Sequence, residues 1–373
     1  TPSLRGSAAN RSRVILNGIP IYQPVRNSQI NGLGNFSLFI TEMVESQYVY
    51  ASNPPLTYGN SSGGLVQIET NQKVVQNSTQ LSLSLANVGF FRDQKLGEKA
   101  FVQAYGNFQF SDAFIGIQPR SLGFLKNFST KDLGLHLHLP LGDKWTAKVF
   151  SYGIRESYQI ETQVYAHRDI ALGGRDRSFH LLRLRKQGKS SVLNLHGGID
   201  LSQSQYAFGN IRSNTQTRQS YLSAEYKVFV GRKFSWQVGA NYDGYARAFR
   251  DTASELFFSV AEGVPTLAID TLARRPLLEG HAYGRWEPSD KLSFSAGIRS
   301  NAPLAGQENF VSFQASGRWN VSNAHSFLLS GGRYHSYMVP NFFFRGNELL
   351  QVDQLALDYT YNGENTSITV AIF

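Results

Sequence analysis

The chain has 373 residues, a formal net charge of +9, many aromatic residues (13%) and few charged ones (17%). It contains no cysteine, which excludes disulfides, thiolate zinc sites and a cysteine nucleophile within it. This length predicts either two domains or one large closed β architecture. No apolar run reaches the ~18 residues that a membrane helix needs, so strands would make any membrane crossing.

The first 70 residues mix short apolar bursts with Pro, Asn and Gly turns and show no long alternating stretch. They end in YGNSSGGLVQIET, Tyr58 to Thr70, in which a glycine-rich turn precedes a short apolar strand. Glycine permits positive φ and close approach of another backbone. A phosphate-binding loop would need a helix N-terminus and usually a lysine, and neither follows. The glycines of this stretch therefore favour close backbone packing over phosphate binding.

From Ser78 onward, apolar and polar residues alternate with the period of two that is typical of strands. DLGLHLHLPL places leucines on one face and His136 and His138 on the other. The alternating runs span mostly nine to twelve residues, which matches the ~9–11 of a tilted membrane strand better than the ~5–6 of soluble ones. The polar face carries Ser, Gln, Asn and Gly, as expected of a water-filled or plugged interior. The two histidines lack a third metal ligand nearby and are interpreted as lumen polar residues.

Short turns alternate with long connections in this region. The turns lie at 96–99, 140–143, 187–189, 231–232, 287–289, 320–324 and 362–364, and the long connections at 111–128, 156–176, 203–218, 246–276 and 336–348. An outer-membrane barrel gathers its long loops on one side, whereas a soluble sandwich has no reason to do so. The pattern predicts about fifteen antiparallel strands, beginning with a hairpin over 78–95.

The positive charge does not indicate a nucleic-acid partner. The basic residues are scattered through predicted loops such as RDIALGGRDR and form no stripe interleaved with stacking aromatics. No nucleophile elbow is present either, so the sequence predicts no hydrolase site.

Motifs in the first 70 residues resemble the plug domain of TonB-dependent outer-membrane receptors. LRG followed by RVILNGIPI is similar to that family's Arg-Gly and R-V-L-x-D-G-x-P patterns. YGNSSGGLVQIET is similar to its Y-G-x-x-x-G-G-V-I-N-I-x-T pattern. The resemblance implies a structural or gating role for Arg5, Gly6, Arg13, Gly18, Pro20, Tyr58, Gly59, Gly63, Gly64 and Thr70.

The chain also departs from the family pattern. Asn17 stands where an Asp is usual and Asn53 where a Gly is usual. Within YHSYMVPNFFFRGNELLQVDQLALDYTY, which resembles a mid-barrel pattern of the family, residues 352–354 replace Pro-Glu-Ser. These departures indicate a divergent member, compatible with a Bacteroidota-type branch.

The resemblance implies an all-β transmembrane antiparallel barrel, with about fifteen strands of a larger barrel present, and a partial N-terminal α+β plug domain. It assigns 1–70 to the C-terminal part of the plug and 71–373 to the barrel. The family's barrels have twenty-two strands, and an odd strand number cannot close with both ends on one side. We therefore expect a fragment truncated at both ends and interpret Phe373 as unrelated to a barrel-end signal.

The same resemblance implies TonB-dependent active uptake, across the bacterial outer membrane, of a scarce siderophore, cobalamin, oligosaccharide or peptide. Its implied partners are TonB with the inner-membrane energising complex, outer-membrane lipids, a surface lipoprotein and a small-molecule or oligomeric substrate. We expect no enzyme activity, catalytic residue, cofactor or metal, and the substrate-binding residues stay undefined. Two alternatives remain open, a passive outer-membrane porin and a surface adhesin-type β protein.

Overall fold

The computed structural model describes residues 12–26, 36–37, 40–51, 53–117, 119–120, 123–256, 258–304, 306–339, 348–364 and 366–372. Strands dominate these ranges, and the helices described are the 3-10 turn η2 (Thr41–Met43) and α1 (Asp112–Ile117). Within the described ranges, no helix combines the length and apolar character needed to cross a membrane.

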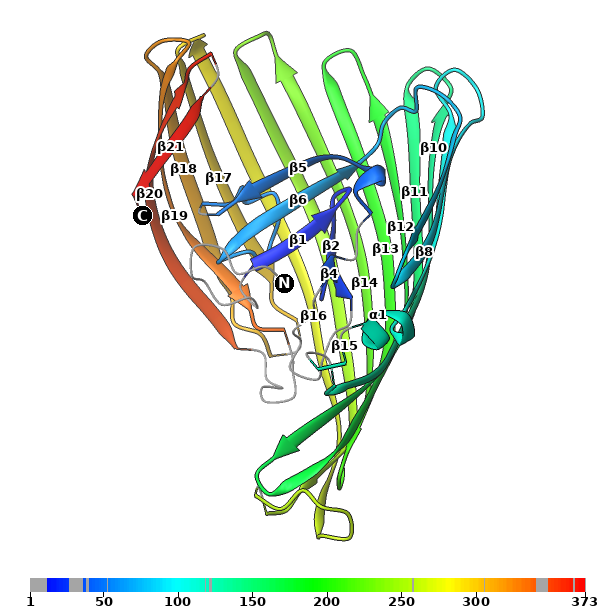
Figure 1. Cartoon of the computed structure of the whole chain (residues 1–373). Helices are drawn as coiled ribbons and strands as arrows, with labels where there is room; N and C mark the ends of the chain where they lie inside the picture. The colour runs from blue at the N-terminus through cyan, green and yellow to red at the C-terminus, as the bar shows by residue number, and fades with distance from the viewer. Residues whose placement is uncertain are drawn as a thin grey trace.

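The large sheet contains fifteen antiparallel strands that follow one another in chain order, with β7 and β21 at its edges. It curves into a wall around the N-terminal region, as Figure 1 shows. The number of strands predicted from the sequence is confirmed. The strands are β7 (Ser78–Ser84), β8 (Asn87–Lys95), β9 (Phe101–Phe110), β10 (Leu125–Leu141), β11 (Trp145–Val164), β12 (His167–Gln187), β13 (Ser191–Phe208), β14 (Ile211–Val230), β15 (Phe234–Ser254), β16 (Thr266–Ser289), β17 (Leu292–Ala302), β18 (Val311–Asn320), β19 (His325–Tyr337), β20 (Leu349–Asn362) and β21 (Ser367–Ile372).

The outer face of this wall is apolar and its inner face carries polar residues, which is the reverse of the arrangement in a soluble protein. Leu83 and Leu133 point outward and are 83% and 69% exposed, whereas Asp243 and His136 point inward and are fully buried. A wall with apolar residues outside and polar residues inside is the pattern of a strand-built membrane barrel, because lipid faces one side and the lumen the other.

Strands β10 to β16 have 17 to 24 residues and are longer than the sequence analysis predicts. The predicted loops 156–176 and 203–218 are wrong, because the chain reverses between β11 and β12 over residues 165–166 and between β13 and β14 over residues 209–210. The predicted loop 246–276 shrinks to 255–265. In these extensions the strands keep pairing through their backbones, but sequences such as IRSNTQTR (211–218) lack the regular apolar–polar alternation that marks a half-buried strand.

The extensions gather at one end of the wall, toward the bottom of Figure 1. We call this the long end. At the opposite, short-turn end the connections are brief, as predicted, at 188–190, 231–233 and 321–324. The predicted turn at 287–289 is displaced, because β16 continues to Ser289 and the chain turns at 290–291.

A small four-stranded sheet lies inside the wall (Figure 1), in the order β2-β1-β6-β5. Asn17 and Gly18 close the hairpin between its first two strands with φ of 50° and 87°, the positive values that an Asn-Gly turn favours. The strands are β1 (Ser12–Leu16), β2 (Ile19–Ile21), β5 (Val44–Tyr50) and β6 (Gly64–Thr70), and a separate pair is formed by β3 (Val25–Arg26) and β4 (Phe36–Ser37).

The small sheet and the wall share one apolar core. Leu16 and Ile68 from the small sheet cluster with Tyr152, Phe179 and Leu181 of the wall, and all five are at most 5% exposed. Burial of apolar surface therefore holds the small sheet in place, since each fully buried large side chain contributes about 1.5–3 kcal/mol.

Candidate functional site

The site that the motif residues build is the contact between the small sheet and the wall. Its centre is Arg13, which β1 projects toward the wall. The Arg13 guanidinium forms an ion pair with Asp243 of β15 and donates a hydrogen bond to the carbonyl oxygen of Gly59 at 2.7 Å. The guanidinium carbon of Arg13 also lies 5.1 Å from the centroid of the Tyr22 ring, in a cation–π contact. Arg13 therefore ties β1, the following hairpin and the 53–63 loop to a single wall carboxylate.

Tyr22 lies between two cations. Its hydroxyl accepts hydrogen bonds from Arg13 and Arg275 and donates one to Asp243 at 2.8 Å. Its ring packs edge-on against Tyr245 at 5.0 Å. Enclosure in the interface raises the pKa of Tyr22 to about 12, although the two guanidinium groups oppose that shift. The phenol therefore keeps its proton at physiological pH and can donate to the carboxylate.

Arginines of the wall are paired with acids on adjacent strands, and both members of each pair are buried. The pairs are Arg175–Glu156 at 2.6 Å, Arg177–Asp200 at 2.5 Å, Arg275–Asp243 at 3.6 Å and Arg299–Glu279 at 2.7 Å. A buried ion pair is stable only when its remaining hydrogen-bonding groups are also satisfied.

Main-chain carbonyls of the N-terminal region accept the remaining hydrogen bonds of these wall arginines. Arg175 donates to Val25 at 2.7 Å, and Arg177 donates to both Tyr22 and Gln23 at 2.7 Å. Arg299 donates to Leu56 at 3.0 Å. These acceptors are neutral, so water can replace them, and each wall arginine would keep its carboxylate if the small sheet moved away.

Fewer contacts join opposite charges across the interface. Among the described residues, three ion pairs do so: Arg13–Asp243, Arg26–Asp132 at 2.9 Å and Arg183–Glu69 at 2.9 Å. Release of the small sheet together with β3 would separate these pairs, while leaving the ion pairs within the wall intact.

Gly59 lies where no side chain fits. A Cβ atom there would overlap the carboxylate of Glu279 and the guanidinium of Arg299. Gly18 has a similar position, since a Cβ there would overlap the His196 ring. These two motif glycines bring backbone directly against charged or polar wall side chains.

Thr70 ends β6 and links three parts of the chain. Its backbone N–H donates to the side-chain oxygen of Asn17 at 3.0 Å, and its hydroxyl lies 3.0 Å from Nε2 of His136. Its carbonyl accepts a hydrogen bond from Lys148 at 2.9 Å. The side chain of Asn17, which replaces the usual Asp, thus closes the small sheet from within, and His136 and Lys148 fix its last strand to the wall.

The 53–63 loop is fixed to strands β18 to β20. Asn53 has a φ of 46°, and its N–H donates to Gln354 at 2.7 Å. The side-chain oxygen of Asn60 accepts from the backbone N–H of Tyr337 at 2.5 Å. The hydroxyls of Ser62 and Ser336 are 2.6 Å apart. Asparagine tolerates positive φ better than most residues, which accounts for its presence at 53, where the family pattern has a glycine.

Of the remaining motif residues, Pro20 contacts the wall, whereas Gly63 contacts β1 of the small sheet. The carbonyl of Pro20 accepts from Gln219 of the wall at 3.3 Å, and the Gly63 carbonyl accepts from Ser12 at 3.4 Å. Gly64 opens β6 with a φ of 126°. Tyr58, in the 53–63 loop, is half-buried. Arg5 and Gly6 lie outside the described residues.

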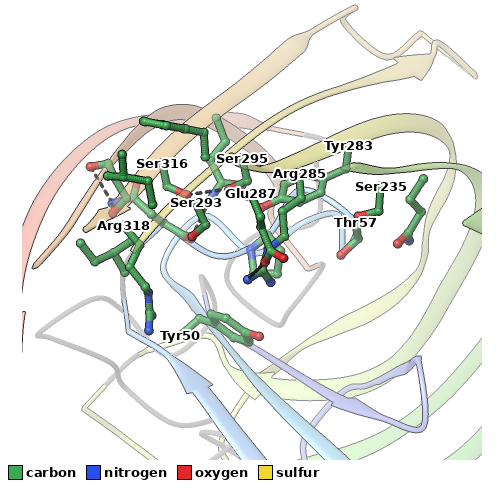
Figure 2. A pocket seen from close by; sticks show the side chains of 18 of the residues that line it. Tyr50, Thr57, Ser235, Tyr283, Arg285, Glu287, Ser293, Ser295, Ser316 and Arg318 are labelled. Atoms are coloured by element: carbon green, nitrogen blue, oxygen red, sulfur yellow. Dashed lines mark hydrogen bonds and ion pairs between the residues drawn. The ribbon is translucent and has the colours of Figure 1, made fainter. Parts of the chain in front are cut away.

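A cavity of about 1120 Å³ separates part of the small sheet from the wall, at the short-turn end. Figure 2 shows Tyr50 below a row of wall residues that includes Arg318, Ser293 and Arg285, and Thr57 also lines the cavity. The wall side combines small hydroxyls with charged groups: Ser235, Ser293, Ser295, Ser316, Ser330, Lys227, Arg285, Glu287, Arg318 and Asp358. Small polar residues leave a hydrated space that a polar solute can occupy.

Sequence reasoning missed the wall arginines that hold the small sheet. The sequence marks such an arginine only as a charged residue in the middle of a polar strand face, as at Arg299. The alternation does not indicate which residue the arginine contacts. His138 stacks on Phe101 at 5.1 Å, and no group of three or more metal-ligating side chains occurs among the residues that the structure describes.

No protein-family model and no curated protein matches the sequence. Solved structures do match. The siderophore receptor PirA from Pseudomonas aeruginosa is 13% identical over 98% of this chain and 66% of its own, with a TM-score of 0.69. The ferric yersiniabactin uptake receptor FyuA from Yersinia pestis is 13% identical over 97% and 62%, with a TM-score of 0.69. The copper transporter OprC is 10% identical over 98% and 64%, with a TM-score of 0.72.

This chain thus spans less than two thirds of the length of these proteins. At such low identity the likeness shows the fold. The predicted resemblance to TonB-dependent outer-membrane receptors, with a partial antiparallel barrel, is confirmed at that level.

Proposed function

We propose that the chain belongs to an outer-membrane receptor that takes up a scarce substrate with energy delivered by TonB. Residues 1–70 are the C-terminal part of its plug, and residues 71–373 form part of the barrel wall. The motif residues, including Arg5 and Gly6, serve as structural and gating elements. The observation that carries this proposal is the small sheet seated inside a wall with an apolar outer face and a polar inner face.

The bonds that hold the small sheet suit repeated release. A barrel of this width would be open without a filling domain. Wall arginines donate to carbonyls of the segments next to the small sheet (Tyr22, Val25 and Leu56) but are neutralised by carboxylates within the wall. Pulling the small sheet away therefore leaves no unpaired charge at those arginines, and water takes over the vacated hydrogen bonds. The three ion pairs that cross the interface make spontaneous release unfavourable, which is why an external force is required.

TonB, coupled to the inner-membrane proton gradient, supplies that force in this proposal. Movement of β5 and the 53–57 segment would widen the cavity at the short-turn end into a passage along the serine-lined wall. No bond is made or broken in the transported molecule, so the protein is a transporter and no enzyme. Further partners are the surrounding outer-membrane lipids and a surface lipoprotein.

The substrate is a siderophore, cobalamin, oligosaccharide or peptide. Structures with the same fold include a siderophore receptor and a copper transporter, which favours metal chelates as the first class to test.

Uptake measurements in cells with and without TonB test the function directly. Cells are offered radiolabelled ferric siderophores, cobalamin, oligosaccharides and peptides in turn. We expect one of these compounds to accumulate in the cells only when TonB is present. Binding of that compound at the cell surface should persist after the proton gradient is collapsed. Accumulation that continues without TonB would instead indicate a passive porin.

Carbonate washing of membranes distinguishes an integral barrel from the remaining alternative, an adhesin-type β protein. An integral barrel stays in the membrane fraction and changes its gel mobility when heated, whereas an adhesin-type soluble β protein is released and migrates at one position.

A further inference from the structure

A pocket of about 350 Å³ opens where the N-terminal region meets the first strands of the wall. Ile40 and the start of η2 line one side of it, and residues of β7, β8 and β9 line the other. Asn87 begins β8 and Gln109 is the last residue but one of β9, so both lie at the end of these strands opposite the short turn 96–100. The pocket therefore lies toward the long end, on the side from which a substrate arrives in the proposed function.

Sheet register brings polar side chains of the wall together in two adjacent rows beside this pocket. Ser82, Gly89 and Asn107 pair across β7, β8 and β9, and Asn87 pairs with Gln109 one row nearer the long end. Gly89 keeps these rows close, since a Cβ there would overlap the hydroxyl of Ser82 and the carboxamide oxygen of Asn107. The pocket is thus lined by a continuous surface of amides and hydroxyls.

Four side chains of this surface make no side-chain hydrogen bond with any other described residue. They are Gln80, Ser82, Asn87 and Gln109, and the carboxamide oxygens of the last two are also buried. By contrast, Gln103 on the same face of β9 is hydrogen-bonded to Asp93 at 2.8 Å and to His136 at 2.9 Å. Buried polar groups almost always have a partner, and a carboxamide turns easily about its terminal bond. These four side chains are therefore available to a ligand in the pocket.

The charges around the pocket favour a neutral ligand. Arg26 lines it but is paired with Asp132 at 2.9 Å. Glu42 is exposed to solvent and accepts a hydrogen bond from the Thr41 hydroxyl at 3.1 Å. An anion would bring acceptors without donors, and a cation would meet the Arg26 guanidinium. Amides and hydroxyls both donate and accept hydrogen bonds, and the hydroxyls of a sugar do the same.

We propose that this pocket binds one sugar ring of an oligosaccharide. Its volume is at the lower end of the ~300–1,000 Å³ usual for small-molecule sites, which suits one ring better than a whole cobalamin. The ring of Phe91 also lines the pocket and offers an apolar surface to the C–H face of the sugar. The inference rests on the function proposed above and selects oligosaccharides among its substrate classes.

Four trisaccharides serve as probes: maltotriose, xylotriose, mannotriose and chitotriose. The intact protein is purified in detergent, and calorimetry measures the Kd of each. We expect at least one of them to bind the wild type. Asn87→Leu/Gln109→Met nearly keeps the side-chain sizes but removes both carboxamides. The same trisaccharide should bind this variant about thirtyfold more weakly, because two hydrogen bonds are lost.

A second pocket variant and a control accompany it. Gln80→Met/Ser82→Ala changes the neighbouring strand and should weaken the same trisaccharide to a similar extent. Gln203→Met removes a carboxamide that is exposed on the outer face of β13, and it should bind like the wild type. Neither pocket variant breaks a side-chain hydrogen bond among the described residues, so the heat-dependent gel mobility of the barrel should be unchanged in both.

Binding of none of the four trisaccharides would overturn the proposal. Equal binding by the wild type and both pocket variants would do so too, as would an equal loss with Gln203→Met. Binding of Ca²⁺ that the pocket variants lose, with no trisaccharide bound, would assign the pocket to a cation instead.

Failure of this proposal and failure of the proposed function give different results. TonB-dependent accumulation of a ferric siderophore, with no trisaccharide bound, would contradict the sugar pocket alone. A trisaccharide that binds at the pocket but accumulates equally without TonB would refute the proposed function alone.

Discussion

The small sheet meets the wall in two unlike regions. Around Arg13 and Arg299, charged wall groups contact its backbone without intervening space. Beside Tyr50 and Thr57, a cavity of about 1120 Å³ lies between the two. Displacement breaks ion pairs and hydrogen bonds in the first region but displaces only water in the second. Resistance to opening and the route of passage therefore lie in different places, and each can be altered separately.

Arg13→Ala should weaken the first region most. It leaves the buried Asp243 with one cation among the described residues, Arg275 at 3.6 Å, besides the hydrogen bond from Tyr22, and it removes the bond to the Gly59 carbonyl. We expect the small sheet to lose about 3 kcal/mol of stability, at the low end for breaking a buried pair because one cation remains. The urea concentration at which residues 12–70 become sensitive to protease measures this.

Arg333→Ala is the matched control for that change. Its partner Asp353 is exposed on the outer face, where water screens the pair. Protease protection of residues 12–70 should stay as in the wild type. If both variants shift the urea midpoint equally, Arg13 has no special role in holding the small sheet.

Gly59→Ala should have the next largest effect on stability. Its methyl group would overlap the Glu279–Arg299 pair, so the loop or the pair must shift, at about 1–3 kcal/mol. Gly97→Ala is the control, because a Cβ there would meet no atom within 4 Å. The same protease assay should show a lower urea midpoint for the first variant only, and an unchanged midpoint in both would contradict close packing at Gly59.

Ser295→Trp alters the second region and should leave stability nearly unchanged. The indole would fill part of the cavity, so we expect slower TonB-dependent uptake with normal surface binding of the substrate. Ala296→Trp is the control, since the neighbouring residue points outward and is exposed. Uptake at the wild-type rate in Ser295→Trp would place the route elsewhere.

Strand periodicity was sufficient to predict the wall. Leu133 and His136 lie on opposite faces of β10 as the alternation indicates, because lipid and lumen impose different polarity on successive residues. The extensions of β11 to β16 could not be predicted in this way. Backbone hydrogen bonds keep these extensions paired, and such bonds leave no mark on the polarity of the side chains.

The motif positions were predicted, but their partners were not. Arg13 and Gly59 are 46 residues apart and meet at Asp243 and Glu279, whose places depend on the register of the whole wall. A single sequence shows a charged residue on a polar face without indicating which residue opposes it. The side-chain bond of Asn17 to Thr70 is hidden for the same reason.

A reversible lock tests most directly whether the small sheet must leave the wall during transport. The chain has no cysteine, and the hydroxyls of Ser62 in the 53–63 loop and Ser336 in β19 are 2.6 Å apart. A Ser62→Cys/Ser336→Cys variant would link the 53–63 loop to the wall by a disulfide when oxidised. Ser295→Cys/Ser316→Cys is its control, because those hydroxyls are 2.7 Å apart within the wall.

Uptake is measured in both variants before and after oxidation, and again after reduction. We predict that oxidation abolishes TonB-dependent uptake in Ser62→Cys/Ser336→Cys, that reduction restores it, and that the wall-to-wall control transports throughout. Undiminished uptake with the 62–336 disulfide fully formed would contradict the account, because the contact of the 53–63 loop with the wall would then stay closed during transport.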